Sequence, residues 1–165
     1  MYGIFFYLLS PEVMWMGIEL NKPQFERFAI WVVNHFGIEN IVETGTFMGT
    51  GSTIAWAKTG IPVTTIECNK DHYHTASDNL KIYKNVTALY GLTLEHSKCV
   101  EFINKDNYIF TGNIRRDFPQ SAEKEYYLRE INQNKDDKEN LLLGLIENDQ
   151  KQLIFLDSCG AIGFL

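Results

Sequence analysis

The chain alternates short apolar segments with helix-length segments, and this alternation restricts its fold more than any other feature. Runs rich in β-branched and aliphatic residues predict four strands, at 40–43, 62–67, 85–90 and 152–157. Parallel strands need a long crossover between them, usually a helix. The pattern therefore predicts an α/β fold with a Rossmann-like parallel sheet and helices on both faces.

Helices are predicted from the spacing of apolar residues and from signals at the helix ends. The first, at 22–36, has Pro23 in its first turn and Gly37 at its C-terminal cap. Asn69 caps a helix at 70–83, and further helices are expected at 51–58 and 93–104.

A long polar segment, 105–151, separates the third and fourth strands. It predicts helices near 121–132 and 138–147, the second with a capping box formed by Asp136 and Glu139. An insertion of this length either covers a functional site or forms a solvated helical bulge, and the sequence leaves both interpretations open.

Length and composition limit the class of protein. A chain of 165 residues suits one domain, here a leading segment at 1–37 and a sheet domain at 38–165. The net charge of -6 argues against a general nucleic-acid binder. Three widely spaced cysteines show no metal-binding spacing, which indicates a reducing, cytoplasmic location. The apolar start lacks a basic region and meets Pro11 too early for a membrane span, so no membrane association is expected.

The stretch "IVETGTFMGTGST", residues 41–53, places a carboxylate and three glycines directly after the first strand. A loop there lies at the carboxyl edge of the sheet, where ligands bind, and glycines let the backbone approach a ligand closely. The loop has no Gly-Lys-Ser/Thr, which excludes a P-loop.

Glu43 would attract a cationic ammonium group. Glu67, at the end of the second strand, suits a bidentate bond to the two hydroxyls of a ribose. An ammonium and a ribose together describe S-adenosylmethionine.

The segment "ETGTFMGTGS" resembles motif I of class I S-adenosylmethionine-dependent methyltransferases, Glu/Asp-x-Gly-x-x-x-Gly. It is most similar to the catechol and caffeoyl-CoA O-methyltransferase form, Glu-x-Gly-x-Tyr-x-Gly-x-Ser. Phe47 stands at the position of the Tyr and Gly51 at that of the Ser, with Ser52 one place later. The resemblance implies that the cofactor is contacted by Glu43, Gly45, Thr46, Phe47, Gly49 and Ser52.

Three further segments resemble later motifs of the same family, so that the resemblance covers about 38–104 and 152–160. "TTIECN" implies Glu67 on the ribose and Cys68 beside the adenine, and "NVTALYGLTLE" implies Gly91 and Leu92 at the border of the adenine. "LIFLDS" implies Asp157 as a catalytic residue facing the methyl group. In metal-dependent relatives that acid is a metal ligand, so a divalent metal is possible.

The resemblance implies methyl transfer from S-adenosylmethionine to the hydroxyl of a small molecule or sugar. The sheet of this family has seven strands in the order 3-2-1-4-5-7-6, and the chain supplies the part 3-2-1-4. We therefore expect either a fragment of a longer protein or a chain that another chain completes. The fourth strand would then be an edge, through which the chain could self-associate.

Two alternatives come from the same residues. "TGTFMGTG" also fits the nucleotide loop Thr-Gly-x-x-x-Gly-x-Gly of short-chain NAD(P)-dependent dehydrogenases. That family needs a Tyr-x-x-x-Lys pair, and no Tyr of this chain has Lys four places later. The second alternative is a non-catalytic nucleotide-binding half-domain, because strands five to seven are missing from the sequence.

Overall fold

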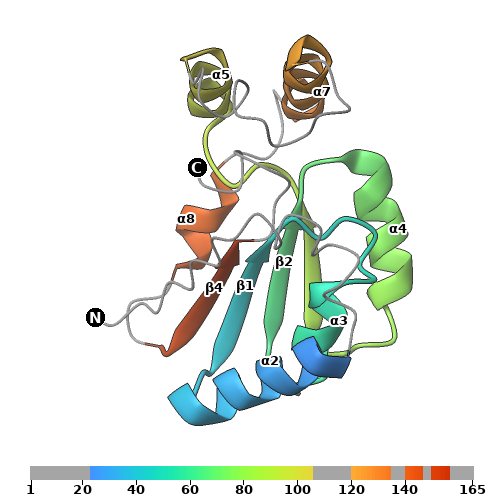
Figure 1. Cartoon of the computed structure of the whole chain (residues 1–165), viewed down its shortest axis with the longest axis vertical. Helices are drawn as coiled ribbons and strands as arrows, with labels where there is room; N and C mark the ends of the chain where they lie inside the picture. Colours follow the sequence, from blue (N-terminus) through green and yellow to red (C-terminus); the bar gives the residue numbers. More distant parts are fainter. Residues whose placement is uncertain (1–22, 106–119, 135–139, 147–149, 157–165) are drawn as a thin grey trace.

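The computed structural model describes residues 23–105, 120–134, 140–146 and 150–156. Within them, four parallel strands form one sheet in the order β3-β2-β1-β4 (Figure 1). The strands are β1 (Asn40–Thr44), β2 (Val63–Glu67), β3 (Val86–Tyr90) and β4 (Gln152–Leu156). This order confirms the predicted α/β, Rossmann-like fold and the arrangement 3-2-1-4.

The register brings the carboxyl ends of the strands together at one edge of the sheet. Thr44 at the end of β1 lies opposite Ile66 of β2 and Leu156 of β4. Glu67 at the end of β2 lies opposite Tyr90 at the end of β3. The loops that follow β1, β2 and β3 therefore start beside one another.

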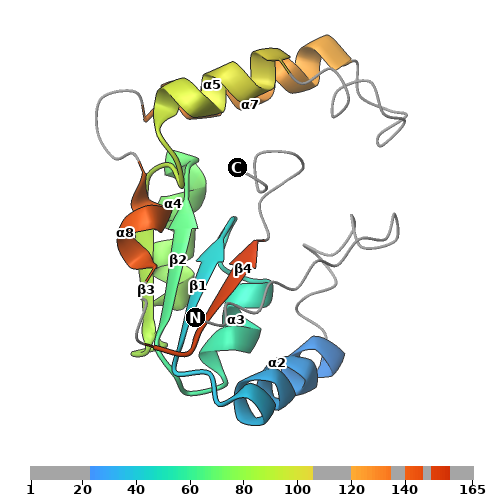
Figure 2. The same ribbon diagram turned by 90° about the vertical axis from the view of Figure 1, so that its left-hand side faces the viewer.

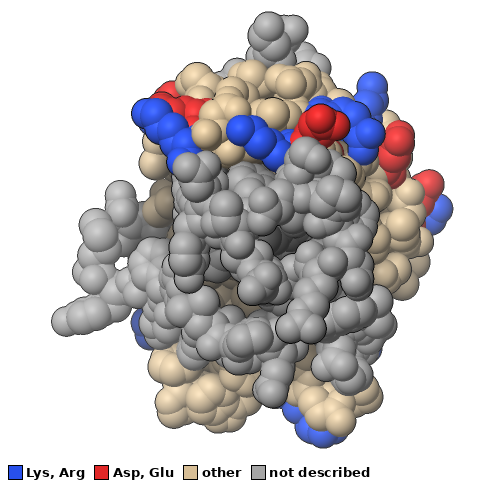
Figure 3. Space-filling view, turned by 45° about the horizontal axis from the view of Figure 1, so that its top comes forward, with Lys and Arg blue, Asp and Glu red and all other residues tan. Residues whose placement is uncertain are grey.

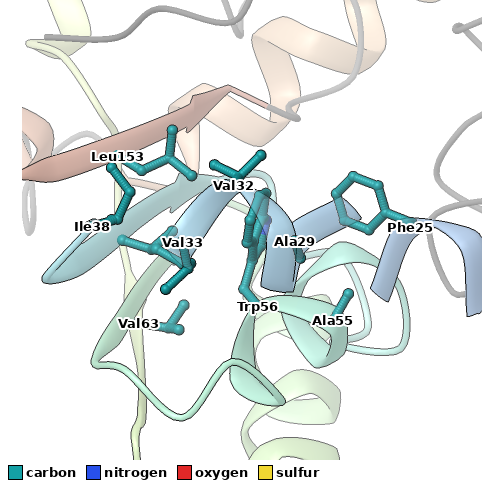
Figure 4. Packing of buried hydrophobic residues seen from close by; sticks show 10 residues of the cluster. Phe25, Ala29, Val32, Val33, Ile38, Ala55, Trp56, Val63 and Leu153 are labelled. Carbon is teal, nitrogen blue, oxygen red and sulfur yellow. The ribbon is translucent and has the colours of Figure 1, made fainter. Parts of the chain in front are cut away.

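One face of the sheet is covered by α2 (Pro23–Phe36), α3 (Ser52–Ala57) and α4 (Lys70–Leu80). Alternate strand residues point to this face, so Ile41, Val63 and Leu153 join the buried side chains of α2 and α3 in one core (Figure 4). Trp56 of α3 is central to it, because its ring meets Phe25 of α2 edge-on at 5.3 Å between centroids. The helices predicted at 22–36 and 51–58 are confirmed to within one residue at each end, and the helix predicted at 70–83 is confirmed but ends earlier, at Leu80.

The opposite face carries the short helix α8 (Leu141–Leu145), which comes from the insertion. Leu145 of α8, Val42 of β1 and Thr64 of β2 line a common surface hollow, and the two strand residues point away from the core of α2 and α3. Helix α8 begins later than predicted, after Asn140, whose backbone is left-handed at φ 58. The expected capping box of Asp136 and Glu139 lies outside the described residues.

Two further helices, α5 (His96–Lys105) and α7 (Gln120–Asn132), lie beyond the carboxyl ends of the strands in both views (Figures 1 and 2). They pack against each other through a second apolar cluster of Leu92, Cys99, Ile103, Tyr127 and Ile131. Helix α7 of the insertion therefore lies at the carboxyl edge of the strands, while α8 of the same insertion lies on a face of the sheet.

Two properties of the described residues bear on the kind of partner the chain can have: the length and hydropathy of its helices, and the distribution of charge on its surface. In the described parts of the chain, no helix is both long and apolar enough to cross a membrane. On the face that Figure 3 shows, basic and acidic side chains lie next to one another along the described surface.

Candidate functional site at the carboxyl edge of the sheet

The loop between β1 and α3 turns sharply because three of its residues have positive φ. These are Gly45 at 83°, Phe47 at 53° and Gly49 at 68°. The Gly45 N–H donates to the Ile66 carbonyl at 2.9 Å, so the start of the loop continues alongside β2. Phe47 is 51% exposed, and its ring meets His72 of α4 edge-on at 4.7 Å. The loop thus exposes the aromatic side chain of Phe47, whose backbone has a positive φ that non-glycine residues seldom adopt.

Glu43 lies beneath this loop with its side chain fully buried, 0% exposed. Its carboxylate accepts hydrogen bonds from Ser52 Oγ at 2.5 Å, Thr53 Oγ1 at 2.6 Å and Thr65 Oγ1 at 2.8 Å. Hydroxyl donors of this kind compensate a buried charge. The carboxylate thereby ties β1, β2 and the start of α3 together.

Thr46 extends the same network, since its hydroxyl lies 2.6 Å from that of Thr65 and both residues are buried. The sequence placed Glu43, Thr46 and Ser52 against a cofactor. The structure gives their side chains a positioning role under the loop, and direct contact with a ligand stays a prediction for all three. The two hydroxyl partners Thr53 and Thr65 were not predicted, because isolated threonines in a strand and a helix carry no distinguishing pattern.

Glu67 ends β2, and its carboxylate is held by two backbone groups. The N–H of Phe47 donates to Oε2 at 2.7 Å, and the N–H of Asn69 donates to Oε1 at 2.8 Å. The residue is 6% exposed. Burial raises the pKa of Glu67 above its ordinary value, the two N–H groups oppose that rise, and the nearby Glu130 carboxylate adds to it. Each carboxylate oxygen retains a further lone pair for another donor.

The residues predicted at the adenine lie next to Glu67 along the same edge. The Gly91 N–H donates to the Glu67 carbonyl at 3.0 Å, and Gly91 itself has φ 151. Leu92 is buried in the cluster between α5 and α7, and Cys68 packs against that cluster. The structure therefore brings Glu67, Cys68, Gly91 and Leu92 together at one edge, and their contact with a cofactor stays a prediction.

The insertion contacts the same edge through residues that the sequence did not single out. Asn134, just after α7, donates from Nδ2 to the Cys68 carbonyl at 2.7 Å, and Glu130 of α7 accepts from Asn69 Nδ2 at 2.8 Å. A polar insertion gives no signal of which of its residues turn inward, because its many acids and amides look alike in the sequence.

The predicted catalytic residue Asp157 lies outside the described residues. Within the ranges that the structure describes, no group of three or more His, Cys, Asp or Glu side chains could hold a metal ion. A metal on Asp157 is therefore not tested by this geometry.

Comparison with known proteins gives no family by sequence: no family model and no curated protein matches the chain. A proposed caffeoyl-CoA O-methyltransferase from Staphylococcus aureus aligns at 28% identity over 61% of this chain and 51% of its own, with a TM-score of 0.40. The O-methyltransferase from Bacillus cereus, solved with S-adenosylhomocysteine, aligns at 23% identity over 61% and 51%, with a TM-score of 0.39.

A third structure, the S-adenosylhomocysteine-bound methyltransferase of Podospora anserina, aligns at 13% identity over 74% of this chain and 75% of its own, with a TM-score of 0.39. The chain spans about half the length of the Staphylococcus and Bacillus proteins. The fold assignment above rests on the strand order of the chain itself.

Proposed function

We propose that the chain is the cofactor-binding part of an S-adenosylmethionine-dependent methyltransferase that acts on a hydroxyl group. One observation carries the proposal: the glycine loop and the acid of β2, predicted separately as two halves of one cofactor site, are joined by the hydrogen bond from Phe47 N–H to Glu67 Oε2. A structural half-domain would not need an acid in the chemical setting described next. A dinucleotide also carries a ribose that such an acid can bind, so the test below includes NAD.

The setting of Glu67 suits a neutral diol. Two backbone N–H groups fix the orientation of its carboxylate, so the remaining lone pairs point in set directions. Two neighbouring hydroxyls of a ribose could donate to these lone pairs at little entropic cost, because the acceptor is already ordered. A phosphate placed there would be repelled by the carboxylate.

The chemistry proposed for the complete site is an in-line displacement. Bound S-adenosylmethionine would supply the methyl group on a sulfonium centre. Glu67 and the glycine loop would orient it, and most of the rate would come from alignment of the two reactants. Asp157 would either accept the proton of the acceptor hydroxyl as a general base, or hold a metal that lowers the pKa of that hydroxyl so that the proton passes to solvent. The acceptor class proposed is a small molecule or a sugar.

The test is the affinity for S-adenosylhomocysteine, measured by titration calorimetry on the parent chain and two variants. Glu67→Ala should weaken binding by about 2 kcal/mol or more, because hydrogen bonds to a charged acceptor are lost. Glu39→Ala, at the opposite edge of the sheet, is the matched control and should bind as the parent does. Equal affinity of Glu67→Ala and parent would contradict the assignment. Tight NAD binding by the parent would favour the dehydrogenase.

A further inference from the structure

The last turn of α7 places a second buried carboxylate beside Glu67. Glu130 is 7% exposed, although it belongs to a predominantly polar insertion. Charged residues are seldom this buried unless something holds them. Asn69, two residues after the end of β2, supplies the contact by donating from Nδ2 to Glu130 Oε1 at 2.8 Å.

Asn69 orients both carboxylates at once. Its backbone N–H donates to Glu67 Oε1 at 2.8 Å while its side chain holds Glu130. The side chain cannot turn away freely, because Asn69 Oδ1 also accepts the two N–H groups that begin α4, those of Asp71 and His72, at 3.0 and 3.1 Å. One residue therefore fixes Glu67 and Glu130 next to each other through three different groups.

Asn134, one turn after Glu130, places a further acceptor in the surroundings of the two acids. Asn134 is 0% exposed, and its Nδ2 donates to the carbonyls of Cys68 and Glu130, while its Oδ1 has no hydrogen-bond partner among the described residues. A buried acceptor without a donor destabilises the folded chain by about 1 to 3 kcal/mol. Two neighbouring carboxylates and an unpartnered amide oxygen would be complemented by a ligand that brings donors.

We propose that Glu130 is the second acid of the ribose site, so that the insertion completes the site by accepting a hydrogen bond from one of the two hydroxyls that bind Glu67. This inference rests on the proposed function and adds a residue that lies outside all the segments that resemble the methyltransferase motifs. It assigns the ligand to ribonucleosides with free 2′- and 3′-hydroxyls. Adding a phosphate at either hydroxyl would bring a negative charge against two carboxylates.

The experiment compares Glu130→Gln with the matched control Glu125→Gln, an exposed glutamate on the same helix. Glutamine keeps the oxygen to which Asn69 donates, so the fold should be retained, and thermal unfolding checks this. Calorimetry measures the Kd of S-adenosylhomocysteine and of its 2′-deoxy and 3′-deoxy analogues. Glu130→Gln should weaken binding of the parent ligand about tenfold, whereas Glu125→Gln should leave it unchanged.

The analogues separate a ligand contact from a structural effect. For one of the two deoxy analogues, removal of the hydroxyl should raise the Kd of the parent about tenfold more than it raises the Kd of Glu130→Gln. The variant has already lost the hydrogen bond to that hydroxyl. If the variant unfolds, Glu130→Asp, which keeps the charge and shortens the reach, takes its place with the same expectation.

Two outcomes would overturn the inference, and they can be told apart. If the parent binds S-adenosylhomocysteine and Glu130→Gln binds every analogue as the parent does, the role of Glu130 falls while the proposed function stands. If the parent binds no S-adenosylhomocysteine, both fall together.

Discussion

Glu43 is the last residue but one of β1 and Glu67 is the last residue of β2, yet their carboxylates are stabilised by different kinds of donor. Hydroxyl side chains surround Glu43 on the inside of the loop, while backbone N–H groups hold Glu67 at its rim. Hydroxyls can be removed by substitution, whereas backbone donors cannot. The two acids therefore allow separate tests of structure and of binding.

Replacing Glu43 should lower the free energy of unfolding of the chain, because its carboxylate is fully buried. In Glu43→Leu the hydroxyls of Ser52, Thr53 and Thr65 lose their buried acceptor, and the free energy of unfolding should fall by about 3 kcal/mol. Urea unfolding measures this. Thr53→Ala, which removes one donor and leaves the hydroxyls of Ser52 and Thr65 on the carboxylate, should cost about 1 kcal/mol. If Glu43→Leu lowered the free energy of unfolding by less than about 1 kcal/mol, the carboxylate would not hold the loop.

The pH dependence of stability should reveal the raised pKa of Glu67. An acid whose pKa is higher in the folded state contributes stability that is full below pH 4.5, the ordinary value, and is lost as the pH rises through the folded pKa. Glu67→Gln cannot ionise and lacks this loss, so its stability relative to the parent should increase as the pH rises above 4.5. Unfolding of both proteins in urea at a series of pH values tests this. A difference that is constant with pH would contradict the pKa shift.

At the scale of elements, Gly49 lets the loop after β1 pack closely against α4. A Cβ there would lie 2.9 Å from Leu80 Cδ1 and 3.2 Å from the backbone Cα of Ala76, and φ is 68°. Gly49→Ala should therefore destabilise the chain by about 2 kcal/mol or more. Gly60 is the matched control because its φ is 83° and, apart from its two chain neighbours, no atom of the described residues lies within 4 Å of an added Cβ. Gly60→Ala should cost only the backbone strain, about 1 kcal/mol, and equal losses would contradict a packing role for Gly49.

Elements with strong local signals were predictable from the sequence. Pro23 and Gly37 delimit α2, and the side chain of Asn69 caps α4 as expected. Helix α8 was placed too early because its start depends on the left-handed backbone of Asn140, which no side-chain pattern announces. The site residues of β2 and β3 followed from their strand ends, but Glu130 and Asn134 did not, since their approach to Cys68 and Asn69 depends on tertiary packing of α7.

At the scale of the whole molecule, β4 is an edge of the described sheet. It pairs with β1 on one side only, and Leu156 at its end is 38% exposed. We propose that the chain self-associates through this strand, because an open apolar edge offers unpaired backbone groups to a second strand. Leu156→Lys should weaken the association by placing charges at the contact.

Sedimentation velocity at several concentrations measures that association. The weight-average mass of the parent should rise with concentration, and the rise should be smaller for Leu156→Lys. A parent mass that stays at one chain, 19.0 kDa, across the range would contradict pairing through β4.

The most direct test of the central claim is a titration of the ¹⁵N-labelled chain with S-adenosylhomocysteine, observed by amide NMR. The N–H groups of Phe47 and Asn69 donate to the carboxylate proposed to hold the ribose, so their resonances should shift most. Amides of α2, such as that of Ala29 in the opposite part of the core, should stay in place. Saturable shifts at Phe47 and Asn69 are the predicted result. An unchanged spectrum at saturating S-adenosylhomocysteine, or shifts confined to residues away from the carboxyl edge of the sheet, would contradict the account.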